Sequence, residues 1–317
     1  MEIPGLGRSA VGRRAARILI ITALLLPGTS VDPVMPGANA NAISLRQHHL
    51  PLQLHRRRDQ TVAESYNWSG YAVTGANGSV SDVKSSWIVP AVACSGAPDG
   101  YAAFWTGIDG WTSSTVEQIG TDSDCVNLEG NQTGVPTYYA WFEFYPKDAY
   151  LIGSYGRGGV CESDCVFPGD TVSAEVKFSG DGGGSSGGFR HRPGERFTVT
   201  ITDETQGWTF TTSATVSGAK QSSAEWIAEA PFGCNTASGF CELSDFGTVN
   251  YGDQLTSVPN TSYATVGGKT QPLGNFGSSV QEAVMVDYAS NTTTMAQPSS
   301  LTDGGTSFAV TWDSAGP

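Results

Sequence analysis

The chain has 317 residues, of which 39% are hydrophobic and 15% charged, and its formal net charge is −13. This acidity argues against nucleic acid and anionic membranes as partners, because like charges repel each other. Near the N-terminus, three arginines at 13–17 precede an apolar run at 18–26, and small residues follow at 38–42. This order is typical of a secretory signal peptide, and the apolar run is too short to span a bilayer of about 30 Å. We therefore expect a signal peptide at residues 1–42 and a secreted, extracellular protein with no membrane partner.

The next stretch, residues 43–63, contains the basic run 56–58 and three of the four histidines. It shows no hydrophobic pattern typical of a folded element, and we interpret it as a basic pro-segment that binds the body of its own chain. Residues 1–60 hold 8 basic and 3 acidic residues, which leaves 9 and 27 in the remainder, a net charge near −18. At acidic pH, protonation of the carboxylates reduces the electrostatic repulsion within such a domain. It also weakens the attraction between the domain and its basic pro-segment. Residues 64–317 are expected to form one domain.

Short β-branched and aromatic runs alternate with turn signals through this domain, and no window of a dozen residues shows a capped helical period. The pattern predicts an all-β sandwich or barrel. The glycine-rich stretch 180–188 and the polar stretch 290–305 are expected to be loops. The expected strands are 67–73, 81–89, 102–109, 115–119, 137–145, 171–178, 197–203, 208–216, 224–230, 280–288 and 307–312.

An even number of cysteines in a secreted chain indicates disulfides, and six cysteines allow fifteen pairings. Close spacing favours one local bridge within 161–165 and another within 234–241, which leaves the first two cysteines to pair with each other. No histidine lies near 161–165, so we expect no metal site there, and no cofactor is indicated. The six positions are Cys94, Cys125, Cys161, Cys165, Cys234 and Cys241.

Residues 105–120 form the most informative stretch, because an aromatic ring, a carboxylate and an amide are expected on one face of a strand pair. In an extended chain, Trp105 and Asp109 point to one face and apolar residues to the other. A turn follows, and the next strand carries Gln118. A solvated hairpin explains this stretch equally well when it is considered alone.

A strand at 138–146 repeats the arrangement, because Trp141, Glu143 and Tyr145 share one face while the other face is apolar. A carboxylate among aromatic rings is what a substrate cleft needs. A solvated strand face is the alternative for this glutamate.

The strand at 224–230 places Glu225 and Glu229 on one face, roughly 13 Å apart, which is too far for a close acid–base pair. The one histidine beyond the pro-segment, His191, lies beside the glycine-rich loop. It is poorly placed for a Ser-His or Cys-His catalyst or for a zinc site. Carboxylates and amides are therefore the candidate catalytic groups.

Four motifs, taken in order, resemble those of the glutamic peptidases, or eqolisins (peptidase family G1). They are Asn67-Trp68-Ser69-Gly70, Trp105-x-Gly107-Ile108-Asp109-Gly110 with Gln118 downstream, Trp141-Phe142-Glu143-Phe144-Tyr145-Pro146 and Ala224-Glu225-Trp226-Ile227-Ala228-Glu229. The resemblance implies a lectin-like (concanavalin A-like) β-sandwich of two antiparallel sheets with the active site on the concave face. It also implies a secreted acid endopeptidase, made as a zymogen, that acts on proteins and peptides. Tyr139 stands where the family has an aspartate.

Carried over position by position, the resemblance assigns Gln118 and Glu229 as the catalytic pair. Glu229 would act as general base and then general acid on water, while the Gln118 amide would stabilise the oxyanion. An amide does not titrate, whereas a histidine with a pKa near 6.5 would be protonated in acid. Asp109 and Glu143 would hold the pair through hydrogen bonds. The residues expected to line the cleft are Trp68, Trp105, Trp141 and Tyr145.

Two other classes of protein fit parts of the same pattern. A glycoside hydrolase would use Glu143 and Glu229 as a carboxyl pair either about 5 Å or about 6.5–9.5 Å apart, and Gln118 would be dispensable. A non-catalytic module would bind carbohydrate or peptide on the same aromatic faces. The basic pro-segment favours the peptidase, and we expect a monomer.

Overall fold

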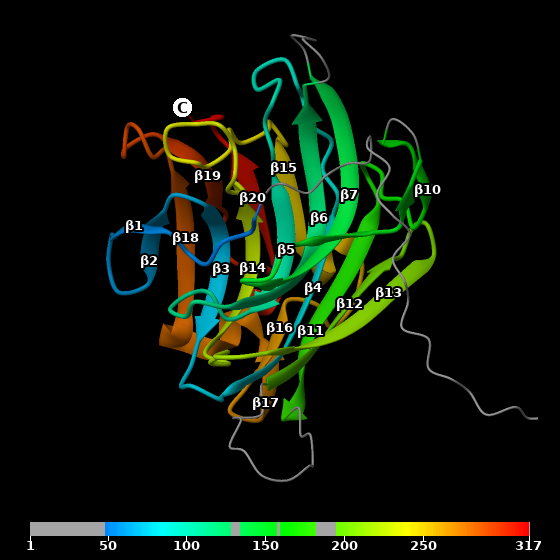
Figure 1. Ribbon diagram of the computed structural model, residues 1–317. Coiled ribbons are helices and arrows are strands. Elements are labelled where there is room, and N and C mark those ends of the chain that lie inside the picture. The colour runs from blue at the N-terminus through cyan, green and yellow to red at the C-terminus, as the bar shows by residue number, and fades with distance from the viewer. Residues whose placement is uncertain (1–47, 128–133, 157–158, 182–194, 317) are drawn as a thin grey trace, which may run out of the picture. The chain divides into compact units, whose positions relative to one another are not determined.

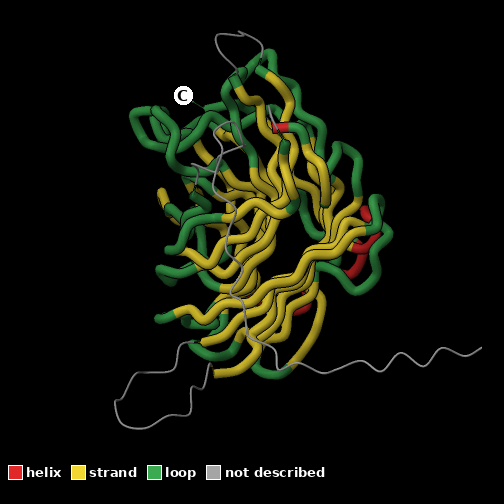
Figure 2. Tube along the Cα trace, turned by 45° about the vertical axis from the view of Figure 1, so that its right-hand side comes forward, coloured by secondary structure: helices red, strands yellow, loops and turns green. Residues whose placement is uncertain are grey.

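The computed structural model describes residues 48–127, 134–156, 159–181 and 195–316 (Figure 1). Regular structure in these ranges is almost entirely β-strand, and helices are limited to α1 (Asp253–Thr256) and short 3₁₀ segments. Figure 2 shows strands curving across the body, with only short helical turns beside them. None of the helices in the described part is long and apolar enough to cross a membrane.

One layer, which we call the site sheet, is antiparallel except for one parallel pair, β2 with β18. In spatial order its strands are β1 (Leu54–Arg57), β2 (Val62–Ser65), β18 (Val280–Val286), β3 (Trp68–Thr74), β14 (Ser223–Glu229), β5 (Ala103–Ile108), β6 (Val116–Val126), β7 (Val135–Tyr145) and β8 (Tyr150–Ile152).

The second layer, the back sheet, packs against the site sheet and is antiparallel throughout. Its strands are β13 (Trp208–Val216), β12 (Glu195–Asp203), β11 (Thr171–Asp181), β4 (Val80–Ile88), β15 (Thr248–Gly252), β20 (Ser307–Trp312) and β19 (Thr294–Pro298), with the hairpin β16 (Tyr263–Val266) and β17 (Lys269–Pro272) paired to β4. β19 also pairs with β18, which joins the two layers at one edge. A separate ribbon consists of β9 (Ser154–Tyr155) and β10 (Cys161–Ser163).

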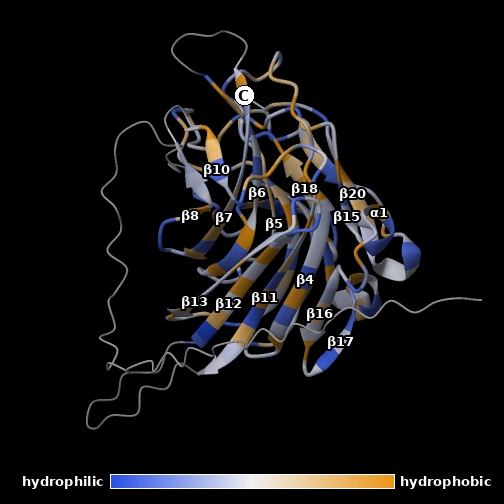
Figure 3. Cartoon of the chain, turned by 90° about the vertical axis from the view of Figure 1, so that its right-hand side faces the viewer, coloured by the Kyte–Doolittle hydropathy of each residue, from blue (hydrophilic) through white to orange (hydrophobic). Residues whose placement is uncertain are grey.

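The main hydrophobic core lies between the two sheets and follows the two-residue period of the strands. Phe104 and Trp226 from the site sheet are in the same buried cluster as Trp87 and Val199 from the back sheet. The alternation of hydrophobic and hydrophilic residues is visible along β11 and β12 in Figure 3. A second apolar cluster covers the outward face of the site sheet. It includes Trp68, Trp105, Trp111, Tyr139, Trp141 and Ile227.

Every strand expected from the sequence is present, and the β-sandwich is confirmed. Two expectations about other stretches are wrong. The polar stretch 290–305 contains β19, because Met295 and Ala296 are buried and the strand pairs with β18 and β20. The stretch 43–63 contains β1 and the start of β2, which pair with each other. The glycine-rich loop lies outside the described residues from 182 onward, and so does His191.

The three expected disulfides are confirmed. Cys161–Cys165 and Cys234–Cys241 close short loops of sequence separation 4 and 7. The third bridge, Cys94–Cys125, joins positions 31 residues apart and fixes the far end of β6.

Candidate active site

The candidate residues occupy three cross-strand rows on the outward face of the site sheet. Directly opposite residues in antiparallel strands are neighbours on one face, and successive rows are about 6.8 Å apart. Gln118 belongs to the first row and Glu229 to the third, with β5 between their strands. The rows are Glu225–Gly107–Gln118–Glu143, then Ile227–Trp105–Gly120–Trp141, then Trp68–Glu229–Ala103–Asp122–Tyr139.

Glu229 is fully buried, and each oxygen of its carboxyl group accepts one hydrogen bond. Trp105 Nε1 donates to Oε2 at 2.8 Å, and Asn67 Nδ2 donates to Oε1 at 3.2 Å. Burial raises the pKa of the Glu229 carboxyl well above its usual range, and the hydrogen bond from Trp105 opposes that rise. The sequence motifs included Asn67 but did not indicate its contact with this carboxyl.

The side-chain amide of Gln118 is oriented by acceptors on its nitrogen. Nε2 donates to Glu143 Oε2 at 3.0 Å and to the backbone carbonyl of His49 at 2.8 Å. An ionised carboxylate only accepts hydrogen bonds, so Glu143 fixes which end of the amide is the donor. Burial raises the pKa of Glu143 to about 6, against hydrogen bonds from His48, His49 and Gln118 that lower it. The expected contact between Glu143 and Gln118 is therefore present.

Trp141 is anchored by a pair of buried aspartates that the sequence motifs did not indicate. Its Nε1 donates to Asp122 Oδ1 at 2.6 Å, while the Tyr139 hydroxyl lies 2.9 Å from Asp122 Oδ2 and 2.6 Å from Asp124 Oδ2. Burial is the main cause that raises the pKa of both aspartates, and their mutual repulsion adds to it for Asp122. The missed signal was the continued alternation of β6, because Asp122 and Asp124 follow Gln118 on the same face.

Asp109 contacts neither Gln118 nor Glu229 by a hydrogen bond in the described structure, so the expected contact with the pair is wrong. Its carboxylate instead accepts bonds from the backbone N–H groups of Lys220, Gln221 and Ser222 at 2.6 to 3.0 Å, and from the Ser222 hydroxyl at 2.9 Å. These residues lead directly into β14, which carries Glu229. Asp109 therefore positions the strand rather than the reacting side chains.

We expect Asp109→Ala to lower the free energy of unfolding by about 3 to 5 kcal/mol, because three backbone N–H groups lose their acceptor at a buried site. Urea unfolding followed by tryptophan fluorescence measures the change. Ser222→Ala is the matched control, since it removes only the hydroxyl bond and should cost about 1 kcal/mol. Equal stability of the two variants would contradict this role for Asp109.

The remaining residues expected in the cleft lie on the same outward face. Trp68 is fully buried and packs edge-on against Trp105, with ring centroids 5.0 Å apart. Tyr145 is half-buried and packs against the same apolar cluster. The sequence therefore placed these aromatic side chains on the correct face.

Residues 48–53, which we call the cleft segment, cross this face directly over the candidate pair. The N–H of His49 donates to Glu143 Oε2 at 3.1 Å, and its ring stacks on Trp141 with centroids 3.6 Å apart. The Leu50 carbonyl accepts from Trp68 Nε1 at 3.0 Å and from Asn67 Nδ2 at 3.2 Å. The outward face thus binds this segment through hydrogen bonds to its backbone.

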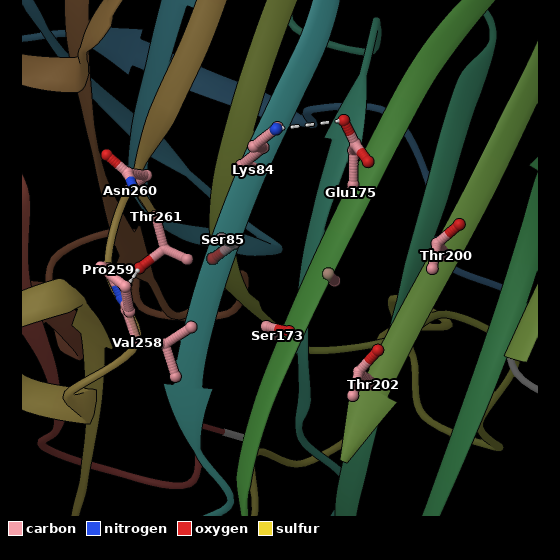
Figure 4. Close-up of a pocket in the computed structure, with 11 residues that line it drawn as sticks. Lys84, Ser85, Ser173, Glu175, Thr200, Thr202, Val258, Pro259, Asn260 and Thr261 are labelled. Atoms are coloured by element: carbon pink, nitrogen blue, oxygen red, sulfur yellow. Dashed lines mark hydrogen bonds and ion pairs between the residues drawn. The ribbon is translucent and has the colours of Figure 1, made fainter. Parts of the chain in front are cut away.

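A separate pocket of about 370 Å³ lies on the outer face of the back sheet (Figure 4). It contains none of the candidate residues, and its charged pair is Lys84 Nζ with Glu175 Oε1 at 3.4 Å. Its lining is otherwise rich in hydroxyl groups, among them Ser173, Thr200 and Thr202. Within the described ranges, no group of three or more His, Cys, Asp or Glu side chains is placed to hold a metal ion.

Comparison with solved structures identifies the class of fold. The chain is similar to scytalido-glutamic peptidase, solved with a transition state analog inhibitor, with a TM-score of 0.54, 19% identity, and coverage of 78% of this chain and 98% of that one. SCP-B, a member of the eqolisin family solved with the tripeptide Ala-Ile-His, also gives a TM-score of 0.54, with 20% identity and the same coverage. At these identities the likeness establishes the β-sandwich fold.

Sequence comparison identifies the family. The chain is 26% identical to aspergillopepsin-2 of Aspergillus niger over 262 residues, which cover 76% of this chain and 75% of that protein. Residues 66–312 match the sequence model of the peptidase A4 family. This chain therefore belongs to the peptidase A4 family, that of the glutamic peptidases, and it is a peptide-bond hydrolase.

Proposed function

We propose that this chain is a secreted acid endopeptidase that hydrolyses proteins with Gln118 and Glu229 as its catalytic pair. The observation that carries the proposal is the backbone carbonyl of His49 at 2.8 Å from the Gln118 amide, on the face that holds the Glu229 carboxyl. A substrate carbonyl in the same place would receive the same hydrogen bond. The inhibitor complex of scytalido-glutamic peptidase and the tripeptide complex of SCP-B support a peptide as the occupant.

In this mechanism the ionised Glu229 takes a proton from a water molecule, which attacks the carbonyl carbon of the scissile bond. Trp105 and Asn67 hold the two carboxyl oxygens, so the base keeps one orientation. The Gln118 N–H stabilises the negative charge that develops on the carbonyl oxygen. Glu229 then returns the proton to the leaving amine, and the peptide bond breaks with no covalent intermediate.

Glu229 must be ionised to act as a base, whereas its burial beneath the cleft segment raises its pKa. Departure of the segment re-exposes the carboxyl to water and removes the main cause of that rise. The Gln118 amide has no proton to lose or gain, so it remains a donor in acid. An amide and a solvated carboxylate together suit an acidic medium.

We also propose that residues 1–42 are a signal peptide, 43–63 a pro-segment and 64–317 the mature domain. The chain between β1 and β2, residues 58–61, is exposed, so cleavage there would separate β1 and the cleft segment from the rest of the chain a few residues before position 64. The three disulfides suit an oxidising compartment outside the cell. Family membership favours this peptidase over the glycoside hydrolase and the binding module.

Cleavage of denatured casein at about pH 3, where a histidine base would be protonated, tests the activity. The acid-treated full chain should release peptides in the presence of pepstatin. Absence of cleavage by the correctly processed chain would contradict the proposal.

Gln118→Ala should lower kcat by about 10² to 10³, because one donor to the oxyanion is lost, and leave KM within about threefold. Steady-state kinetics on a quenched fluorescent peptide measure both constants. Gln271→Ala, on β17 away from the cleft, is the matched control and should behave as wild type. Unchanged kcat in the Gln118 variant would instead support a mechanism that uses carboxyl groups alone.

A further inference from the structure

β1 is the outer neighbour of β2 at one edge of the site sheet. On its inner side β2 pairs in parallel with β18, and on its outer side it pairs antiparallel with β1, with Arg56 opposite Glu64. The exposed turn 58–61 links the two strands covalently. Once that turn is cut and β1 leaves, β2 becomes the edge strand, and one row of its backbone N–H and C=O groups is unpaired.

The Glu64 carboxylate is the main side-chain anchor for β1, and its side chain is 2% exposed. Arg56 binds it as a fork, because Nε contacts Oε2 and Nη2 donates to Oε1 at 3.1 Å, and Arg58 Nε also donates to Oε1. Such charge-assisted bonds are strong and fix the geometry of the pair. The hydrogen bond from Arg56 lowers the pKa of the Glu64 carboxyl below its usual range, so the bound carboxylate stays charged in mild acid.

Arg57 lies on the opposite face of β1 and has partners of its own. Its Nη1 donates to Gln281 Oε1 at 2.9 Å, and its guanidinium carbon lies 6.0 Å from the ring centroid of Trp111. Both partners are buried. A guanidinium is attracted to the face of an indole ring at this distance. Both faces of a strand in this position therefore meet groups that favour a basic side chain.

The strand continues the cleft segment without interruption. The backbone carbonyl that accepts a hydrogen bond from Gln118 belongs to His49, and Arg56 and Arg58 follow it by seven and nine residues. A substrate whose scissile carbonyl lies on the Gln118 amide, and which extends as this segment does, therefore reaches Glu64 with the residues at these two places.

We propose that the mature enzyme uses the outer edge of β2, with Glu64 as its anchor, as a second binding site for basic, extended stretches of its protein substrates. The substrate backbone pairs with β2 as an added strand, and its basic side chains replace those of Arg56 and Arg58. This inference rests on the proposed function, because it takes the pro-segment as removed and the Gln118 amide as the mark of the scissile bond.

Register separates this site from general attraction between an acidic domain and a basic peptide. A diffuse negative charge attracts arginine at any position along the peptide. A paired strand does not, since a shift of one residue moves every side chain to the opposite face. Arginines two residues apart can therefore form the bonds to Glu64 in one register and lose them in the next.

The binding test uses the full chain with the site of a specific protease placed in the turn 58–61 and cut after folding, in the inactive Glu229→Gln background. A labelled peptide with the sequence of residues 48–59 should exchange onto the cut chain at about pH 5, where a free glutamate is ionised. Fluorescence anisotropy then compares two unlabelled competitors of equal composition. One has arginine at positions 56 and 58 and serine at 57 and 59, and the other has these residues exchanged.

The first competitor should bind about tenfold more tightly, because only its arginines reach Glu64. Glu64→Gln should abolish this preference. Glu204→Gln is the matched control and should keep it, since Glu204 is exposed in the turn between β12 and β13. Equal binding of both competitors to the chain with Glu64 intact would overturn the proposal, and so would an undiminished preference in Glu64→Gln. Neither result depends on catalysis.

Steady-state kinetics of the acid-processed enzyme extend the test to substrates. Quenched peptides that are cut at one bond, identified by product mass, should differ in KM by about tenfold, with kcat within about threefold. The lower KM belongs to arginines seven and nine residues after the residue of the scissile carbonyl, and the higher KM to arginines eight and ten residues after it. If binding follows register but no peptide is cleaved, the catalytic assignment fails and the edge site stands. Cleavage with a KM independent of register refutes the edge site for substrates.

Discussion

Replacing Glu229 with glutamine is expected to lower kcat by about 10⁴-fold, the upper end of what one general base contributes. Glutamine has nearly the same shape, so the cleft should keep its form while losing the group that accepts the proton from water. Trp105 and Asn67 would still surround the side chain, since Trp105 lies on the neighbouring strand β5 and Asn67 directly precedes β3. Acid-treated protein and the quenched peptide give kcat directly.

Glu225→Gln is the matched control for this variant. Glu225 lies on the same strand and face as Glu229, four residues earlier, and is equally buried. It contacts neither reacting group by a hydrogen bond in the described structure, so its variant should keep kcat within about threefold. An active Glu229→Gln enzyme, or an equal loss in both variants, would remove Glu229 from its role as the base.

The full chain should be less stable at pH 7 than at pH 4, by at least about 3 kcal/mol. Burial raises the pKa of Glu117, Asp122, Asp124 and Glu225 above the values of the unfolded chain. A carboxyl whose folded pKa is raised binds more protons in the folded state, so its stabilisation is lost as pH rises from about 4 towards the folded pKa. A tenfold difference in proton affinity between the folded and unfolded chain corresponds to about 1.4 kcal/mol for each such carboxyl.

Urea unfolding at both pH values, in the inactive Glu229→Gln background to prevent self-digestion, measures this difference. Glu117→Gln removes one of the buried carboxyls that ionise. The difference in unfolding free energy between pH 4 and pH 7 should therefore be smaller in that variant. Glu204→Gln is the control, because the Glu204 side chain is exposed in the turn between β12 and β13 and accepts one hydrogen bond, from Ser173; it should leave the difference in unfolding free energy between pH 4 and pH 7 unchanged. Greater stability at pH 7 than at pH 4 would contradict the protonated state of the buried carboxyls.

The faces of the strands could be predicted because alternation is a local property of an extended chain. In β14, Trp226 points into the core and Glu229 to the outward face, as the pattern at 224–230 predicted. The same rule placed Trp105 and Trp141 together on the second apolar cluster. Assignment of Gln118 and Glu229 as partners needed a known family, because no local pattern relates two strands that lie far apart in sequence.

What the sequence did not predict depends on contacts between distant segments. β1 lacks a hydrophobic period. It is held in place by its pairing with β2 and by Arg56 and Arg58, which both bind the Glu64 carboxylate. Nothing in the local sequence distinguished His49 from His48 or His55, and only the tertiary structure places its ring on Trp141. Asp109 lies just beyond β5 with a positive φ, so strand alternation does not place its side chain, and its partners follow it by more than a hundred residues.

Gln118 and Glu229 stand on β6 and β14, which are separated by the width of a single strand, β5. Two strand spacings amount to about 9.6 Å across the sheet, and the two rows between the residues to about 13.6 Å along the strands; the backbone ladder holds both values independently of the connections at the strand ends. Insertions and deletions in those connections can therefore accumulate during evolution while the proposed catalytic pair keeps its separation. Descendants of this chain can diversify in substrate preference through residues around the cleft and still break the same bond in the same way.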